Sequence, residues 1–147
     1  MLKNINKNIK ILYVEDDEIA RENGIEYLQN FFEQIYEASD AIKALQLYEK
    51  YQPDIIITDI QMPKLNGLEF VKRIRQKDKK TQIIIITAFC DKDYLLKAIE
   101  LGLVKYLVKP VCEKEFEEAL FLCVNSLQNN ESNILKLDET SYFDIFN

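Results

Sequence analysis

The sequence contains no histidine and only three cysteines, which excludes several common kinds of functional site. Zinc sites need histidine or closely spaced cysteine ligands, and Cys90, Cys112 and Cys123 do not have the spacing of metal ligands. The odd number of cysteines indicates reduced thiols rather than a disulfide framework. Any metal that this chain binds is therefore expected to have oxygen ligands.

Basic residues and long apolar segments are also scarce. The chain has 19 lysines and arginines against 25 acidic residues, which gives a net charge of −6. This balance argues against a nucleic-acid surface and against binding to anionic membranes. The apolar runs are too short to span a bilayer, and the N-terminus lacks the apolar core of a signal peptide. We therefore expect a cytoplasmic protein, and 147 residues suit one domain.

Short β-branched runs alternate with helix-length amphipathic segments along most of the chain. Strands are predicted at about 9–14, 34–37, 54–58, 82–87 and 105–108, and helices begin near Glu18, Ala41, Leu68, Asp91 and Glu113. Strict alternation predicts an α/β fold in which helices cover both faces of a parallel sheet. The first strand suits a central position, so we expect the flavodoxin-like, doubly wound, five-stranded order 2-1-3-4-5.

The two ends of the chain fall outside this alternation. Residues 1–8 are polar and form a lead-in, and residues 9–127 form the predicted domain. Residues 128–147 begin with a polar, linker-like run, and 134–137 has the pattern of a short strand. Two interpretations stay open for this C-terminal segment. It is either a linker with the start of a truncated second module, or an arm that packs on this domain or on a partner.

Four of the predicted strands end in chemically reactive side chains. One strand leads into Glu15, Asp16 and Asp17, and three others lead into Asp59, Thr87 and Lys109. The carboxyl ends of parallel strands share one edge of the sheet, and the expected order places the first and third strands side by side. We therefore expect the carboxylates, the hydroxyl and the ammonium group to meet at one place.

This combination of groups is suited to phosphoryl transfer. Clustered carboxylates repel one another, and a divalent cation with oxygen ligands, most simply Mg²⁺, compensates for that repulsion. Asp59 stands alone at the end of a central strand, so it is the candidate nucleophile that would form an acyl phosphate. Lys109 would neutralise part of the phosphoryl charge, and Thr87 would donate its hydroxyl to a phosphoryl oxygen.

The segments that carry these groups resemble a known family. Residues 11–17, 54–67, 83–88 and 105–110 resemble the receiver domain of bacterial two-component response regulators, and the match covers roughly residues 9–127. The resemblance implies a Mg²⁺-dependent signalling switch that accepts a phosphoryl group from a sensor histidine kinase or a phosphotransfer protein. It does not imply an enzyme with an external substrate, because such a domain catalyses only its own phosphorylation and dephosphorylation.

The resemblance assigns a metal site and a phosphoacceptor to this chain. Glu15 and Asp16 would bind Mg²⁺ together with Asp59 and the backbone carbonyl of Gln61. The run of three acids leaves open whether Asp16 or Asp17 completes the acidic pair. Asp59 would receive the phosphoryl group.

A second set of residues would sense the phosphoryl group. Thr87 and Lys109 would bind it, and Tyr106 matches the switch aromatic of the family, which would turn inward after phosphorylation. The Lys109–Pro110 peptide bond is expected to be cis. The output surface would be the face made by the fourth helix, the fifth strand and the fifth helix, and a homodimer through this face is a further expectation.

Two positions depart from the usual pattern or vary within it. Phe89 stands where many members of the family have a small residue, and Gln61 follows the phosphoacceptor by two positions. Both would flank the route of an attacking water, so both are candidates for tuning the lifetime of the acyl phosphate.

Other functions are compatible with parts of this pattern. A phosphatase of the haloacid dehalogenase type would need a second aspartate where Gln61 stands, and a phosphorylation-independent scaffold usually lacks one of the acidic or lysine residues found here. The output of the switch stays open between transcriptional regulation through a missing effector domain, a larger signalling chain, and a stand-alone receiver that acts by protein contact only. Residues 1–127 are not expected to bind nucleic acid.

Overall fold

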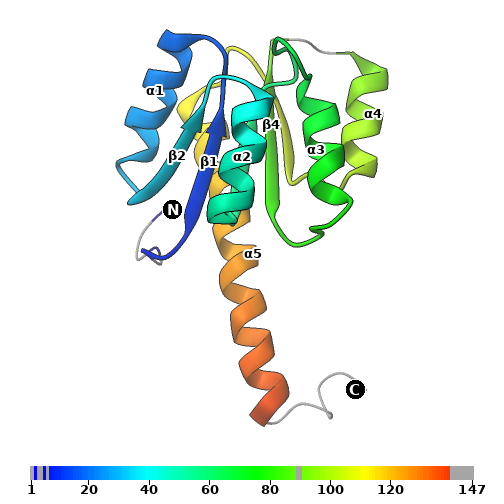
Figure 1. Cartoon of the computed structure of the whole chain (residues 1–147). Helices are drawn as coiled ribbons and strands as arrows, with labels where there is room; N and C mark the ends of the chain where they lie inside the picture. The colour runs from blue at the N-terminus through cyan, green and yellow to red at the C-terminus, as the bar shows by residue number, and fades with distance from the viewer. Residues whose placement is uncertain (1, 3–4, 6, 89–90, 140–147) are drawn as a thin grey trace.

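Five strands and five helices alternate along the part of the chain that the structure describes (Figure 1). The structure is a computed structural model that describes residues 2, 5, 7–88 and 91–139, with side chains described up to residue 129. The strands are β1 (Lys10–Val14), β2 (Gln34–Ala38), β3 (Ile55–Thr58), β4 (Gln82–Thr87) and β5 (Lys105–Val108). The helices are α1 (Glu18–Leu28), α2 (Ala41–Tyr51), α3 (Gly67–Arg75), α4 (Lys92–Glu100) and α5 (Glu113–Glu139).

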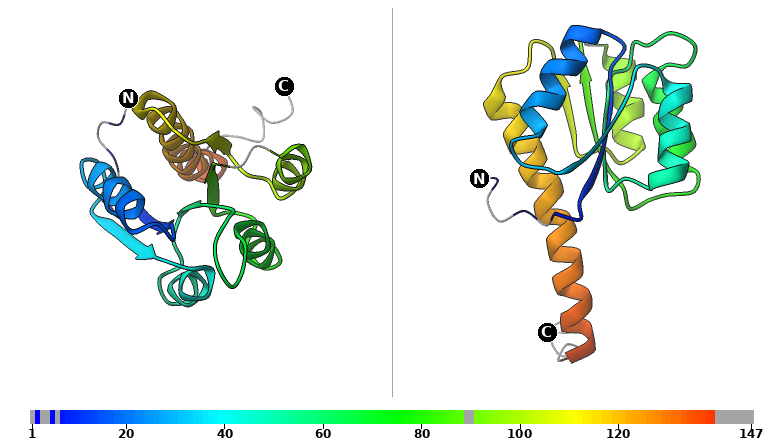
Figure 2. Two further views of the ribbon diagram at one scale, coloured as in Figure 1. Left: turned by 90° about the horizontal axis from the view of Figure 1, so that it is seen from above. Right: turned by 60° about the vertical axis from the view of Figure 1, so that its left-hand side comes forward.

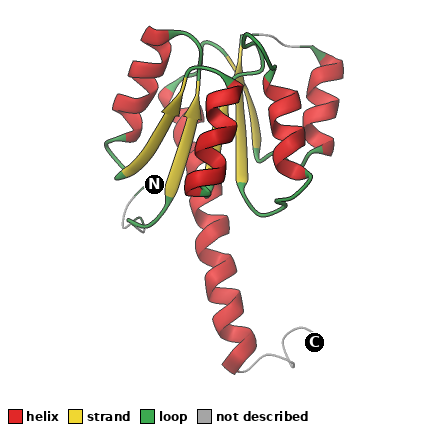
Figure 3. Cartoon of the chain, in the orientation of Figure 1, coloured by secondary structure: helices red, strands yellow, loops and turns green. Residues whose placement is uncertain are grey.

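The strands form one parallel sheet, and the predicted strand order is confirmed. The order is β2-β1-β3-β4-β5, so β1 and β3 lie next to each other with Val14 opposite Thr58 (Figure 3). Ile55, Ile56 and Ile57 of β3 are almost fully buried, because helices cover both faces of the sheet. The carboxyl ends of β1 and β3 therefore meet in the middle of one edge.

The sheet separates two hydrophobic clusters, one on each face. Alternate residues of a strand point to opposite faces, so Ile57 joins a cluster with Leu28 of α1 and Leu120 of α5. Its neighbour Ile56 joins the second cluster, which includes Phe70 of α3 and residues of α2 and α4. Figure 2 shows the same division, with α1 and α5 on one face and α2, α3 and α4 on the other. The doubly wound arrangement is confirmed.

Short polar side chains fix the starts of the first four helices. The N-cap residues Asp17, Asp40, Asn66 and Asp91 each accept a hydrogen bond from a backbone N–H in the first turn. Gly102 follows α4 with a φ of 72°, a left-handed conformation that glycine adopts without strain. These helix starts follow directly on the strand ends, so the loops that carry the reactive side chains are short.

The last helix is longer than the sequence suggested. We expected the helical pattern to end near Leu127, but α5 extends to Glu139 and runs past the sheet (Figure 1). The short strand at 134–137 was therefore wrong. No glycine or proline follows Pro110, so no backbone breaker stops the helix in the polar run after Leu127. The proposed boundary at residue 127 stays a prediction, and residues 140–147 lie outside the described residues.

Candidate functional site

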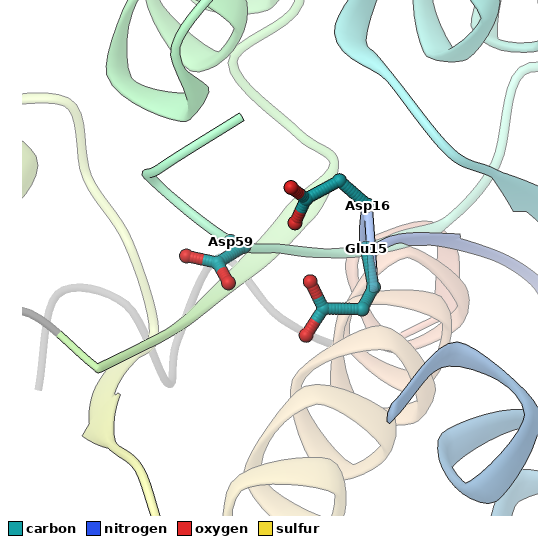
Figure 4. Close-up of side chains that lie close together, drawn as sticks. All are labelled: Glu15, Asp16 and Asp59. Carbon is teal, nitrogen blue, oxygen red and sulfur yellow. The ribbon is translucent and has the colours of Figure 1, made fainter. Parts of the chain in front are cut away.

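Three carboxylates meet at the carboxyl edge of the sheet. Glu15 and Asp16 follow β1 and Asp59 follows β3, and the backbone N–H of Asp59 donates to the carbonyl of Val14 at 3.1 Å. One oxygen from each carboxylate lies within 4.8 Å of the other two, as Figure 4 shows. Glu15 is only 3% exposed and Asp59 only 7%, whereas Asp16 is exposed. A cation at this place would therefore be reached by protein oxygens from two neighbouring strands.

The neighbouring Asp17 has a different position. Its carboxylate accepts a hydrogen bond from the backbone N–H of Ala20 at 2.8 Å and thereby caps α1. The structure thus brings Asp16 into the cluster with Glu15 and Asp59 and leaves Asp17 at the helix start. The spacing of three acids in a row could not distinguish these two positions, because the start of α1 decides between them.

Lys109 links two of the buried carboxylates. Its Nζ donates to Oδ2 of Asp59 at 2.8 Å and also to Oε1 of Glu15. Burial alone would lower the pKa of the Lys109 ammonium group, but the hydrogen bonds to Asp59 and Glu15 outweigh it and raise that pKa above its usual value. Its backbone N–H donates to the carbonyl of Thr87 at 2.7 Å, and its peptide bond to Pro110 is cis.

The charges at this edge are not balanced. Three carboxylates face one ammonium group, and burial raises the pKa of Glu15 although the hydrogen bond from Lys109 opposes that rise. The donor atoms are all oxygens, and two of the three carboxylates are buried. Such a set fits a hard divalent cation such as Mg²⁺, which prefers carboxylate oxygens and stabilises their ionised form.

The remaining predicted residues surround this cluster at different depths. Thr87 is fully buried at the end of β4, and Tyr106 is half-buried on β5, where it packs against the cluster that α2, α3 and α4 cover. The backbone N–H of Gln61 donates to Oδ1 of Asp59 at 3.1 Å, and the residue itself is exposed. Phe89 lies outside the described residues.

Two residues support the cluster without having been singled out from the sequence. Arg21 of α1 donates from Nη1 to the backbone carbonyl of Glu15 at 2.9 Å and pairs with Glu37 of β2 at 3.4 Å. Gly67 packs so closely on the site that a Cβ there would lie 1.9 Å from the carbonyl oxygen of Asp59. Gly67 had a visible signal, a glycine in the loop after the central aspartate. Arg21 had none, because its contacts depend on the tertiary structure.

The membrane prediction can be compared with the described helices. Within the described part of the chain, no helix is long and apolar enough to cross a membrane.

Comparison with known proteins places these residues in a family. The family model for the response regulator receiver domain matches residues 11–121. An uncharacterized response regulatory protein of Staphylococcus epidermidis is 31% identical over 93% of this chain and 54% of its own length. The transcriptional regulatory protein BtsR of Salmonella typhimurium is 38% identical over 76% of this chain and 46% of its own length. The chain spans about half the length of the curated relatives it matches.

Solved structures give the same result for the fold and the family. The N-terminal domain of an uncharacterized protein from Wolinella succinogenes is 39% identical, with a TM-score of 0.78 over 83% of this chain and 98% of that chain. The chemotaxis protein CheY4 of Vibrio cholerae is 29% identical, with a TM-score of 0.72 over 78% of this chain and 98% of that chain. Together with the matched residues 11–121, these similarities show that the chain belongs to the family of response regulator receiver domains of two-component systems.

Proposed function

We propose that Asp59 accepts a phosphoryl group from a phosphorylated histidine of a sensor kinase or phosphotransfer protein. The observation that supports this most strongly is the position of Asp59 within hydrogen-bonding distance of Lys109 and next to the Glu15–Asp16 pair. Receiver domains are signalling domains rather than enzymes with an external substrate, and the family match makes the same role the simplest one here. The switch would act in the cytoplasm, where such kinases present their phosphohistidine.

The transfer would be a direct displacement at phosphorus. A carboxylate oxygen of Asp59 forms the new P–O bond while the P–N bond to the donor imidazole breaks, and the electron pair of that bond stays on the imidazole nitrogen. Lys109 would exchange one of its two carboxylate partners for a phosphoryl oxygen, and Thr87 would donate its hydroxyl to another. Mg²⁺ held by Glu15, Asp16, Asp59 and the carbonyl of Gln61 would supply further positive charge.

Phosphorylation would then change the surface that other proteins read. It adds a charge of roughly −1.5 to −2, which Thr87 would follow, and Tyr106 would turn inward. The face of α4, β5 and α5 is the proposed output surface, and it is also where a second copy would bind. Phe89 and Gln61 are the proposed tuning residues, and Phe89→Ala is expected to shorten the lifetime of the acyl phosphate in an autodephosphorylation assay.

Two outputs follow from the relatives and from the chain itself. Several relatives, BtsR among them, are named transcriptional regulatory proteins and are about twice as long as this chain. We infer that this receiver controls transcription through residues beyond the acidic domain. The alternative is a receiver or scaffold that acts by protein contact only, which the intact set of Glu15, Asp16, Asp59 and Lys109 does not require.

Phosphorylation of the intact protein with acetyl phosphate and Mg²⁺ tests the proposal. Mass spectrometry of the wild type is expected to show one added phosphoryl group, and peptide mapping is expected to place it on Asp59. Asp59→Asn should abolish the label, whereas Asp54→Asn, a matched change at the other end of β3, should keep it. Labelling that persists in Asp59→Asn, or a wild type that takes no label, would contradict the proposal.

A further inference from the structure

A cavity of about 310 Å³ lies between β1, α1 and the start of α5. It adjoins the acidic site, because Glu15 and Lys109 form its inner end, but most of its wall comes from α1 and from the segment around Phe116. The walls are mainly apolar. A volume near 300 Å³ with apolar walls and a few polar groups is typical of a small-molecule pocket. We call this space the α1–α5 cavity.

Tyr13 projects into the α1–α5 cavity from the central strand β1. The residue is 7% exposed, and its hydroxyl has no hydrogen-bond partner among the described residues. A Cβ at position 24 of α1 would lie 2.4 Å from this hydroxyl, so the glycine there makes room for the phenol ring. Burial raises the pKa of Tyr13 to about 12, so the hydroxyl stays protonated and can donate a hydrogen bond.

Tyr27 supplies a second unpaired hydroxyl to the same cavity. Its ring is held edge-on between Phe31 and Phe116, at centroid distances of 5.4 and 5.3 Å. Its hydroxyl oxygen is buried and has no hydrogen-bond partner in the described structure. Leaving a hydroxyl without a partner costs about 1–3 kcal/mol. A phenylalanine would fill the same space without that cost, so the hydroxyl calls for a ligand that accepts its hydrogen bond.

We propose that the α1–α5 cavity binds a small neutral molecule with an apolar body and a carbonyl-type acceptor for the hydroxyls of Tyr13 and Tyr27. The ligand should be neutral because Glu15 and Lys109 already pair at the inner end, and Glu113 at the wall repels anions. The apolar walls offer a water few of the two to four polar partners that a buried water needs. The inference does not rest on the proposed function, since the binding requires neither phosphoryl group nor metal.

A pair of matched probes tests both the cavity and its hydroxyls. Acetophenone carries one carbonyl acceptor, and ethylbenzene has nearly the same shape without it. Titrated into the full chain and followed by amide NMR, both should give saturable shifts confined to α1 and to the first turn of α5, and acetophenone should bind more tightly. Tyr27→Phe should weaken acetophenone roughly ten-fold, the equivalent of about one hydrogen bond, and should leave ethylbenzene unchanged.

Control variants separate binding in the cavity from binding elsewhere. Tyr36→Phe removes a hydroxyl from a tyrosine that stacks on Tyr51 on the other face of the sheet, so it should not change either affinity. Ala20→Leu fills the cavity from α1 and should abolish binding of both probes. Absence of saturable shifts, shifts that survive Ala20→Leu, or equal affinity for the two probes in wild type and Tyr27→Phe would overturn the proposal. So would a crystal structure in which ordered water alone satisfies Tyr27.

Discussion

Two groups of buried charges lie at opposite edges of the sheet, and they differ in how completely their charges are matched. At the carboxyl edge, Glu15, Asp16 and Asp59 share one ammonium group. At the amino edge, near the starts of β3 and β4, the guanidinium of Arg75 and the carboxylate of Asp78 lie among backbone groups. We call the first the acidic cluster and the second the arginine cluster.

The arginine cluster has partners for its charges within the protein. Arg75 donates to the carbonyls of Leu101 at 2.7 Å, Gly102 at 3.1 Å and Asp78 at 3.1 Å. The carboxylate of Asp78 accepts from the Tyr48 hydroxyl at 2.6 Å and from the backbone N–H groups of Lys80 at 2.8 Å and Thr81 at 3.1 Å. This cluster joins the end of α3 to the end of α4 and to α2, which is a structural role.

The pKa directions of the two carboxylates express the same difference. Burial raises the pKa of Glu15 in the acidic cluster, because one lysine is too little compensation. Burial also acts to raise the pKa of Asp78, but its hydrogen bonds from Tyr48 and the backbone lower that pKa below the usual value of 3.8. A buried carboxylate that the protein leaves under-compensated marks a place where a ligand completes the charge balance. The comparison therefore teaches that burial of charge alone does not identify a functional site.

The largest expected effect on stability concerns the arginine cluster. Arg75→Met leaves three buried carbonyls without their donor, so it should lower the free energy of unfolding by about 3 kcal/mol. Guanidinium denaturation measures this value. Arg73→Met on the exposed side of the same helix should change it by less than about 0.5 kcal/mol. Equal effects of the two substitutions would remove the structural role of Arg75.

A smaller effect is expected when the tyrosine of this cluster loses its hydroxyl. Tyr48→Phe should cost about 1.5 kcal/mol near neutral pH, because the hydroxyl donates to a buried carboxylate. The folded-state pKa of Asp78 is depressed, so its stabilisation is present above the unfolded value and is lost as the pH falls through the folded value. The gap between variant and wild type should therefore close in acid urea titrations. A gap that widens in acid would reverse the assigned direction.

The acidic cluster should respond in the opposite way to loss of a charge. Asp59→Asn removes one of three mutually repelling carboxylates and leaves Lys109 paired with Glu15. In metal-free buffer the variant should be more stable than wild type by about 1 kcal/mol. Thermal unfolding in the presence of a chelator checks this gain. A clear loss of stability would mean that Lys109 already balances the cluster.

Sequence reasoning reached the strand order and the convergence of the strand ends because both follow from local patterns. The alternation of β-branched runs with amphipathic segments implies the topology, and the topology brings Asp59 next to Glu15. The extension of α5 was not predictable in the same way, because a run of Asn, Gln and Ser is compatible with a linker as well as with a helix. The contacts of Arg21, Arg75 and Tyr27 were out of reach, since each depends on residues that are distant in the sequence.

Binding of Mg²⁺ tests the central difference between the two clusters most directly. The thermal midpoint of the wild type should rise with Mg²⁺ concentration, because a ligand that binds only the folded state stabilises it. Asp78→Asn should start from a lower midpoint and rise by the same amount, whereas Asp59→Asn should show little rise. A Mg²⁺ response that is equal in wild type and Asp59→Asn would contradict the claim that the acidic cluster is completed by a divalent cation.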